Sequence, residues 1–600
     1  MAQRRRVVGW LAASVPAVIT VSLISLPVTH AAPTAPEAKN GVGAPIGTDP
    51  YLSPSGNGGY DVKRYDLKFK YSPSSHGIAA ARVLVKAKSL QQLDRFSLDA
   101  GMGLNIASVR VAGHEAKFRH KGGKLAVRGF PAIPADTAFT TKVRYAGKPQ
   151  PLVDSSGRGR FGWLRTPNGV VTYSEPNGTS TWIPSNDIFY DKAKWRIDAT
   201  VPSGLMAVST GKLTKKTQNQ ESVRTVWKMS TPIQNYAQVV AIDRFAFSRK
   251  PIAGVRSFVA VSKDAPVNVR NMLKRTKRAM KWTTAKLGPY PFKDTGAIVV
   301  FGGNSALETA GRPTYSGDLY YAHQDTVLHE IAHQWFGNRL TATNARDMWL
   351  HEGFATYLEN VAASERKGRN LDDVVHTQYV QDGWGSGRHG QFDSVPLADP
   401  TPRYLLNSTP YFRGQAAVHA LRAELGESEF WAALRAIASV PNGTTTDADA
   451  VISDLEKVTG RSLAAWSATW LYSTGYQALP VAPSHPAVVR QMADGILDAA
   501  GDWSHKRKTS AQVGLERAVR SYSPMNQLVI EKTRSSGSGK KRRVFVDFHT
   551  KTSPLYPRRY ASCFVFKPRA TQTLLGAWAG VEFSDDYSAN TFTTAACPTR

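Results

Sequence analysis

The sequence contains few cysteines and few acidic residues for its length. Cys563 and Cys597 are the only cysteines among 600 residues, so at most one intramolecular disulfide can form. Acidic residues number 46 against 76 basic ones, which gives a formal net charge of +30 at pH 7. No recognisable nucleic-acid-binding motif accompanies this charge, so we expect no specific nucleic-acid partner. We find no internal repeat, and no apolar stretch beyond the N-terminus is long enough to span a bilayer.

The N-terminus has the pattern of a secretion signal. Residues 4–6 are arginines, an apolar stretch covers 7–28, and Ala31 and Ala32 are small residues suited to a cleavage site. We expect cleavage after Ala31 or Ala32 and hence a secreted, extracellular protein. An uncleaved membrane anchor is the alternative, and the signal type, general or twin-arginine, stays open. In an exported protein the excess positive charge favours association with anionic cell-surface polymers.

Hydrophobic periodicity divides the rest of the chain. From Tyr60 apolar and polar residues alternate, as in half-buried strands, up to about residue 247. A helical pattern covers 264–287, a buried strand is predicted at 296–301, and helices predominate after Tyr411. The expected order is a signal peptide at 1–31, a flexible leader at 32–58, a β domain at 59–247, a second domain at 248–477, a linker at 478–489 and a small β-rich domain of unknown role at 490–600. We expect a disulfide between Cys563 and Cys597 to close this last domain.

Two histidines and a glutamate have the spacing of a metal site. His329 and His333 are four residues apart, so a helix places both imidazoles on one face, with Glu330 beside them. Eighteen residues separate His333 from Glu352, which lies in a second apolar-rich stretch predicted to form an antiparallel helix. Two histidines and one glutamate hold one zinc ion and leave a fourth position open for water. The pattern therefore predicts a catalytic site with one Zn²⁺ per chain.

Longer segments around these residues resemble a known family. HEIAHQWFGN, which begins at His329, and WLHEGFATYL, which begins at Trp349, closely resemble motifs of the aminopeptidase N family of gluzincin zinc metallopeptidases. The similarity covers about 60–478 and includes GPYPF and WIPSNDIFYDKA. It implies a multidomain α+β protein, in which an N-terminal antiparallel β-sandwich-like saddle precedes a thermolysin-like zinc catalytic domain at 248–477. The β-rich C-terminal domain lies outside the resemblance.

The resemblance also implies an activity and a set of site residues. The expected protein is a secreted zinc-dependent aminopeptidase, in which a water activated at the zinc ion attacks the N-terminal peptide bond. Glu330 is expected to act as general base and then as general acid, and Tyr411, in the family's Y-x-[KR]-G pattern, to stabilise the oxyanion. Glu308 and Glu175 are expected to bind the free α-ammonium group of the peptide substrate.

The sequence departs from the family at the amine-binding segment, and two alternatives stay open. Ser305, Leu307 and Thr309 stand where the family's G-x-M-E-N segment carries glycine, methionine and asparagine. Weaker amine binding would permit an endopeptidase or another zinc hydrolase, although Glu308 argues against this. The other alternative is a surface-binding protein with an inert zinc domain, but neither Glu330 nor a zinc ligand has been lost. The candidates for supporting the ligands are Asn338, Asp347, His351 and Thr356.

Overall fold

The computed structural model describes residues 41–153, 159–302, 305–317, 323–379, 394–475, 477 and 479–480, together with four strands between 528 and 580. The predicted signal peptide at 1–31, most of the predicted linker at 478–489 and Cys597 lie outside the described residues. Export and the disulfide therefore stay predictions. Within the described residues, no helix has the length and apolar character that crossing a membrane requires.

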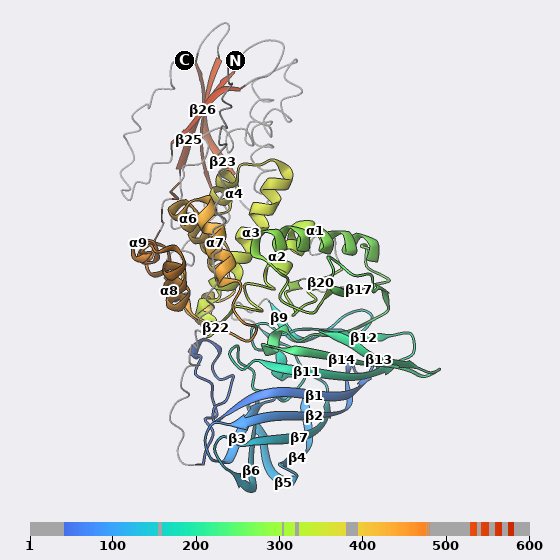
Figure 1. The fold of residues 1–600 in the computed structure, drawn as a ribbon. Helices are drawn as coiled ribbons and strands as arrows, with labels where there is room; N and C mark the ends of the chain where they lie inside the picture. The colour runs from blue at the N-terminus through green and yellow to red at the C-terminus, as the bar shows by residue number, and fades with distance from the viewer. Residues whose placement is uncertain are drawn as a thin grey trace, which may run out of the picture. The chain divides into compact units, whose positions relative to one another are not determined.

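The N-terminal domain is built on a ten-stranded sheet with the order β13-β14-β11-β1-β2-β7-β4-β5-β6-β3 (Figure 1). The strands are β1 (Tyr60–Ser72), β2 (Gly77–Ser89), β3 (Leu93–Asp99), β4 (Leu104–Val111), β5 (His114–Lys121), β6 (Lys124–Ile133), β7 (Ala138–Gly147), β11 (Ala193–Pro202), β13 (Lys212–Gln218) and β14 (Ser222–Ile233). Neighbouring strands such as β1 and β2 are antiparallel, whereas β1 and β11 are parallel. The alternation in β1 places Tyr65, Leu67, Phe69 and Tyr71 in the core.

A second sheet packs against the inner face of the first, and its order is β12-β15-β10-β9-β8. Its strands are β8 (Leu152–Val153), β9 (Arg160–Arg165), β10 (Val170–Tyr173), β12 (Met206–Ser209) and β15 (Val240–Asp243). One hydrophobic cluster contains Leu67 and Val83 from the large sheet and Trp163 and Val171 from the small one. The N-terminal domain is therefore β-rich and sandwich-like, as predicted. Strand β10 ends two residues before Glu175 and so positions it.

Residues 41–58 are ordered, which corrects the flexible leader predicted for 32–58 over the part that is described. The segment contains a 3-10 turn, η1 (Pro50–Leu52). Asp49 is fully buried, and its carboxylate accepts a hydrogen bond of 2.7 Å from the backbone N–H of Ala345. Because Ala345 belongs to the second domain, this segment contacts both domains.

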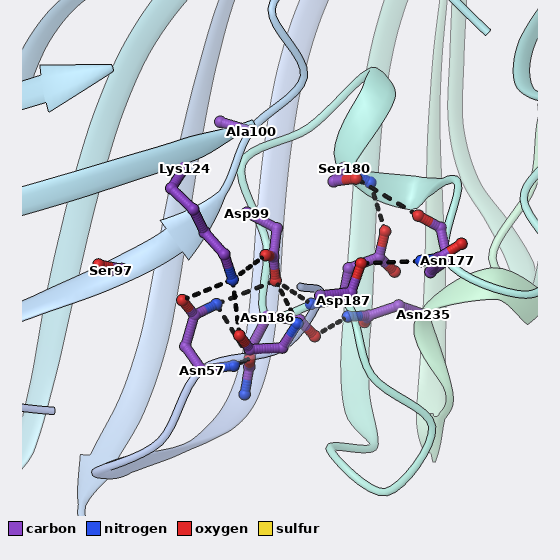
Figure 2. A network of polar contacts seen from close by, with 12 residues as sticks. Asn57, Ser97, Asp99, Ala100, Lys124, Asn177, Ser180, Asn186, Asp187 and Asn235 are labelled. Carbon is purple, nitrogen blue, oxygen red and sulfur yellow. Dashed lines mark hydrogen bonds and ion pairs between the residues drawn. The ribbon is translucent and has the colours of Figure 1, made fainter. Parts of the chain in front are cut away.

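A buried polar network holds this segment against the β domain, as Figure 2 shows. Asp99 accepts hydrogen bonds from the backbone N–H of Gly56 at 3.0 Å and from the side chain of Asn57 at 2.9 Å. Lys124 forms an ion pair of 2.5 Å with Asp99, and Asn57 donates its backbone N–H to Asn186 at 2.7 Å. The glycine- and proline-rich composition of residues 41–58 gives the backbone only a weak local preference for any one conformation. These tertiary hydrogen bonds supply the order that the local sequence does not.

The second domain combines a five-stranded sheet, β16-β17-β18-β20-β19, with helices (Figure 1). The strands are β16 (Phe245–Ser248), β17 (Arg256–Ser262), β18 (Asp294–Val300), β19 (Ala306–Leu307) and β20 (Thr314–Ser316), and β21 (Thr341–Ala342) pairs separately with β22 (Thr445–Thr446). The helices are α1 (Val269–Leu287), α2 (Gln324–Ala332), α3 (Trp349–Lys367), α4 (Leu371–Thr377), α6 (Gly414–Leu425), α7 (Glu427–Ile437), α8 (Ala448–Thr459) and α9 (Ala464–Ser467). The helical pattern at 264–287 corresponds to α1. The boundary predicted after residue 247 falls inside β16, which pairs with β17, so this domain begins at Phe245.

The C-terminal region contributes four described strands. These are β23 (Leu528–Ser536), β24 (Arg542–Thr550), β25 (Arg559–Phe566) and β26 (Leu574–Gly580). They form an antiparallel sheet in sequence order. The chain as a whole is mixed α+β, with a β-rich N-terminal domain followed by a largely helical one.

Candidate active site

Helices α2 and α3 bring the three predicted metal ligands together. His329 lies in the last turn of α2, His333 caps the end of α2, and Glu352 lies in the first turn of α3. The Nε2 atoms of the two histidines are 3.0 Å apart, and Glu352 Oε2 lies 3.3 Å from His329 Nε2 and 3.4 Å from His333 Nε2. Ligand atoms around a tetrahedral zinc ion are about 3.3 Å apart, because each metal–ligand bond is about 2.0–2.1 Å long. The three side chains therefore fit one zinc ion.

Each histidine is oriented by a hydrogen bond from its other ring nitrogen. His333 Nδ1 donates to the carbonyl oxygen of Phe336 at 3.0 Å, and His329 Nδ1 donates to Glu359 at 3.1 Å. With Nδ1 protonated, Nε2 of each ring presents a lone pair to a metal. Glu359 is absent from the residues predicted from the sequence. The sequence feature that could have identified Glu359 is its position seven residues after Glu352, which places it two turns along the same face of α3.

Glu330 lies beside the ligands and is only 6% exposed. Its Oε2 atom forms no hydrogen bond with any described residue. Burial is the largest influence and raises the pKa of Glu330 to about 8; the charge of Glu308 acts in the same direction, and the two histidines oppose it. A carboxylate with this affinity for a proton can accept one from water near neutral pH, as a general base must.

Tyr411 lies in a π-helical turn, η7 (Thr409–Arg413), which leads directly into α6. Its ring stacks with the imidazole of His329 at a centroid distance of 6.4 Å. A Cβ atom on either Gly353 or Gly414 would lie 2.8 Å from the backbone of the other, so glycine at both positions allows this close approach of α3 and α6. Burial, followed by nearby carboxylates, raises the pKa of Tyr411 well above its ordinary value. Its hydroxyl therefore keeps the proton that donation to an oxyanion requires.

Glu308 follows β19, the edge strand of the five-stranded sheet of the second domain. Its side chain is buried, and its Oε1 atom accepts a hydrogen bond of 2.8 Å from the hydroxyl of Tyr236. The side chain of Asn338 donates to the carbonyl oxygen of Glu308 at 2.6 Å, and the hydroxyl of Tyr173 donates to the carbonyl oxygen of Ser305 at 3.2 Å. These bonds fix the segment in which the sequence departs from the family pattern.

Glu175 reaches the same cleft from the β domain. The cleft has a volume of about 1010 Å³ and is lined by Glu175, Glu308, Glu330 and the three metal ligands. The Oε1 atom of Glu175 is buried and forms no hydrogen bond with any described residue. Burial, and then the charges of Glu308, Glu352 and Glu330, raise the pKa of Glu175 well above its ordinary value. Glu352 and Glu359 also line the cleft, so five carboxylates converge there and favour a cationic group beside them.

The four residues predicted to support the ligands occupy other positions. Asn338 holds the backbone of Glu308, as described above. His351 accepts a hydrogen bond of 2.9 Å from a backbone N–H in β21, and burial lowers the pKa of His351 to about 3, which keeps its ring neutral. Asp347 and Thr356 are buried, and their side-chain oxygens have no hydrogen-bond partner among the described residues. Of the residues that the structure describes, Glu359 rather than these four supports a ligand side chain.

Comparison with known proteins points to the same chemistry. Residues 308–470 match the profile of the peptidase family M1 domain. Aminopeptidase N of Streptomyces lividans is 28% identical over 224 residues, which are 34% of this chain and 26% of that protein. Aminopeptidase M1-D of Oryza sativa subsp. japonica is 25% identical over 382 residues, 56% of this chain and 41% of that protein. The chain thus spans less than half the length of these curated relatives.

Solved structures share the fold. The M1 zinc metallopeptidase from Deinococcus radiodurans superposes with a TM-score of 0.64 at 24% identity, over 72% of this chain and 99% of the other. A mutant of that metallopeptidase bound to a Tyr-Ser-Ala substrate gives a TM-score of 0.65 at 25% identity, with the same coverage. The zinc-fitting triad lies within the residues matched to the family profile. Residues 308–470 therefore match a peptidase family M1 domain, and the comparisons support the aminopeptidase N family of zinc metallopeptidases.

Proposed function

We propose that this protein is a zinc-dependent aminopeptidase that hydrolyses the first peptide bond of peptides with a free N-terminus. The observation that carries the proposal is that Glu308 and Glu175 line the same cleft as the metal triad. A metal triad alone supports hydrolysis anywhere along a peptide. Buried carboxylates beside it favour a substrate that brings a positive charge to the cleft.

The described residues supply the separate chemical roles. His329, His333 and Glu352 would hold a zinc ion, which supplies Lewis-acid activation of a water molecule and of the scissile carbonyl. Glu330 accepts a proton from this water and later donates it to the departing amine. The hydroxyl of Tyr411 donates a hydrogen bond to the oxyanion that develops on the carbonyl oxygen.

The amine end determines the direction of cleavage. Glu308 and Glu175 accept hydrogen bonds from the α-ammonium group, and the edge strand β19 offers backbone groups to the substrate. Repulsion from neighbouring carboxylates contributes to the raised pKa of Glu175. A bound ammonium group offsets this repulsion, so substrate binding and ionisation of Glu175 favour each other.

A panel of aminoacyl anilides, free and N-acetylated, tests this function with and without a zinc chelator. We expect rapid hydrolysis of the free substrates only, loss of activity with the chelator and recovery when zinc is added back. Equal hydrolysis of free and acetylated substrates would instead identify an endopeptidase or another zinc hydrolase. A zinc-loaded protein that hydrolyses neither would be a binding protein with an inert zinc domain.

We also infer that the mature protein is exported and associates with anionic polymers at the cell surface. The support is the basic and apolar N-terminus with small residues at 31–32, and the formal charge of +30. N-terminal sequencing of the mature protein should give a first residue at 32 or 33. An intact N-terminus in the membrane fraction would identify an anchor instead.

A further inference from the structure

The outer face of the ten-stranded sheet carries a row of directly opposed cations. Lys68 of β1 lies opposite Arg82 of β2, and Arg82 lies opposite Arg144 of β7, three strands that run side by side in Figure 1. All three side chains are exposed, whereas the residues that alternate with them in each strand are buried. Adjacent strands are about 4.8 Å apart, so the backbone positions that carry the three cations span about 10 Å. Lys68, Arg82 and Arg144 are termed the cation row below.

No described carboxylate forms an ion pair with the cation row. Asp66, on the same face of β1, already pairs with two cations at 2.5 and 3.2 Å. Asp198 of β11 lies opposite Lys68 and pairs with two arginines at 2.9 and 2.7 Å. Lys70 and Lys142 lie on the same face and also have no acidic partner among the described residues. The face therefore carries positive charge that its own carboxylates do not neutralise.

This arrangement opposes the stability of the sheet. Like charges directly opposite each other on adjacent strands repel. The spacing of about 4.8 Å between neighbouring backbone positions is shorter than the Debye length of about 8 Å at physiological ionic strength, so salt screens repulsion between the cations only in part. An acidic residue in place of Arg82 would attract both Lys68 and Arg144, yet all three positions of the cation row are basic. A ligand explains such a row better than the fold does.

The chemistry of the face narrows the class of ligand. None of the described large apolar side chains that are exposed lies on β1, β2 or β7. Stacking of nucleobases requires exposed aromatic rings, and insertion into a bilayer requires exposed apolar side chains. A linear polymer with repeating phosphate groups requires only positive charge.

We propose that the cation row, together with Lys70 and Lys142, is a docking surface for a linear phosphate polymer. The inference rests on the association with anionic polymers proposed above and gives it a place on the fold. Charge complementarity supplies the recognition, and the polymer lies across β1, β2 and β7. The cleft is lined by residues of other elements, so a docked polymer leaves the peptidase site accessible.

Binding of inorganic polyphosphate to the full-length protein tests the proposal. The variant K68Q/R82Q/R144Q removes the cation row. The matched control K274Q/R278Q/K281Q removes three exposed charges from α1, so both variants have the same net charge. Loss of three phosphate contacts should reduce the slope of log Kd against log salt by about 2. We expect the row variant to bind at least about tenfold more weakly at physiological salt, and the control to change by less than about twofold.

The outcomes separate the docking surface from the functions proposed above. Equal weakening in the two variants would show that affinity follows net charge, and would overturn the docking surface. Failure of the unmodified protein to bind polyphosphate would overturn the association itself. Hydrolysis of a free aminoacyl anilide, measured in parallel, reports the peptidase separately and should be the same in all three proteins.

Two further measurements bear on the choice of ligand and on the role of the row. Single-stranded DNA of equal charge should bind no more tightly than polyphosphate; clearly tighter binding would make a nucleic acid the partner and overturn the proposal. The row variant should melt at a higher temperature than the unmodified protein, because it loses like-charge repulsion. A lower melting temperature would show that the cations serve the fold and not a ligand.

Discussion

The metal end of the cleft, at His329, His333 and Glu352, and its proposed amine end, at Glu308 and Glu175, are built in different ways. The metal end comes from α2 and α3, where the helical repeat places His329 and His333 on one face and the following helix adds Glu352. At the proposed amine end, Glu308 comes from the edge of the five-stranded sheet of the second domain and Glu175 from the β domain, and they share a cleft only because the domains pack together. The metal triad and Glu330 are therefore encoded on two successive helices, whereas the carboxylates proposed to set the direction of cleavage meet only through tertiary packing.

The supporting hydrogen bonds follow the same division. Glu359, which orients His329, lies on the same helix as Glu352. Tyr236, which donates to Glu308, comes from the 3-10 turn η3 (Asn235–Ala237) of the β domain. Disturbing the packing between domains should therefore affect amine recognition before it affects metal binding.

The largest effect is expected at the metal end, from Glu330→Gln. Loss of the general base should lower kcat by about 10³-fold, while the zinc content stays that of the unmodified protein because the ligands are intact. Steady-state assays with a free aminoacyl anilide measure kcat, and metal analysis measures the zinc content. A kcat within tenfold of the unmodified value would remove Glu330 from its role as base.

At the amine end, Glu308→Ala should discriminate between substrates. The kcat/KM for free aminoacyl substrates should fall by about 10²-fold, because a buried charge-assisted contact is lost. Any residual hydrolysis of N-acetylated substrates should not fall. Glu424→Ala, which truncates an exposed acid of α6, is the matched control and should leave both rates unchanged. Parallel losses on free and blocked substrates would contradict the division between the two ends.

Glu359→Gln tests the local support of the metal end. The substitution weakens the hydrogen bond that orients His329, so zinc affinity should fall by about 10–100-fold. Competition with a chromophoric chelator measures the affinity. Selectivity for free over acetylated substrates should persist once zinc is saturating, and a change in that selectivity would argue against independent ends.

The smallest effect is expected from Tyr236→Phe, which removes only the hydroxyl that donates to Glu308. The phenyl ring preserves the packing against Phe189. Loss of a hydrogen bond to a charged group should raise KM for free-amine substrates by about tenfold, with kcat and zinc affinity little changed. An unchanged KM, or weaker zinc binding, would show that Tyr236 does not position the amine-binding carboxylate.

Features formed by residues close together in sequence could be predicted, whereas features formed by residues far apart in sequence could not. The metal triad was predictable because its residues lie on two successive helices with a fixed repeat. The helical spacing from Glu352 could have identified Glu359. No sequence pattern could have identified Tyr236, because its contact with Glu308 spans two domains. The order of residues 41–58 was also missed, since hydrogen bonds that Gly56 and Asn57 donate to Asp99, at the end of the distant strand β3, supply it.

By itself, the sequence determined the resemblance to the family, the residues of the candidate metal site and the alternation that gives each strand an inner and an outer face. Local backbone geometry fixes these features, because residues a few positions apart on one helix or strand have nearly constant separations. The tertiary structure alone decided which residues from distant segments meet, namely the pairing of Tyr236 with Glu308 and the register that aligns Lys68, Arg82 and Arg144. Those distances depend on domain packing and strand register, which no local pattern specifies.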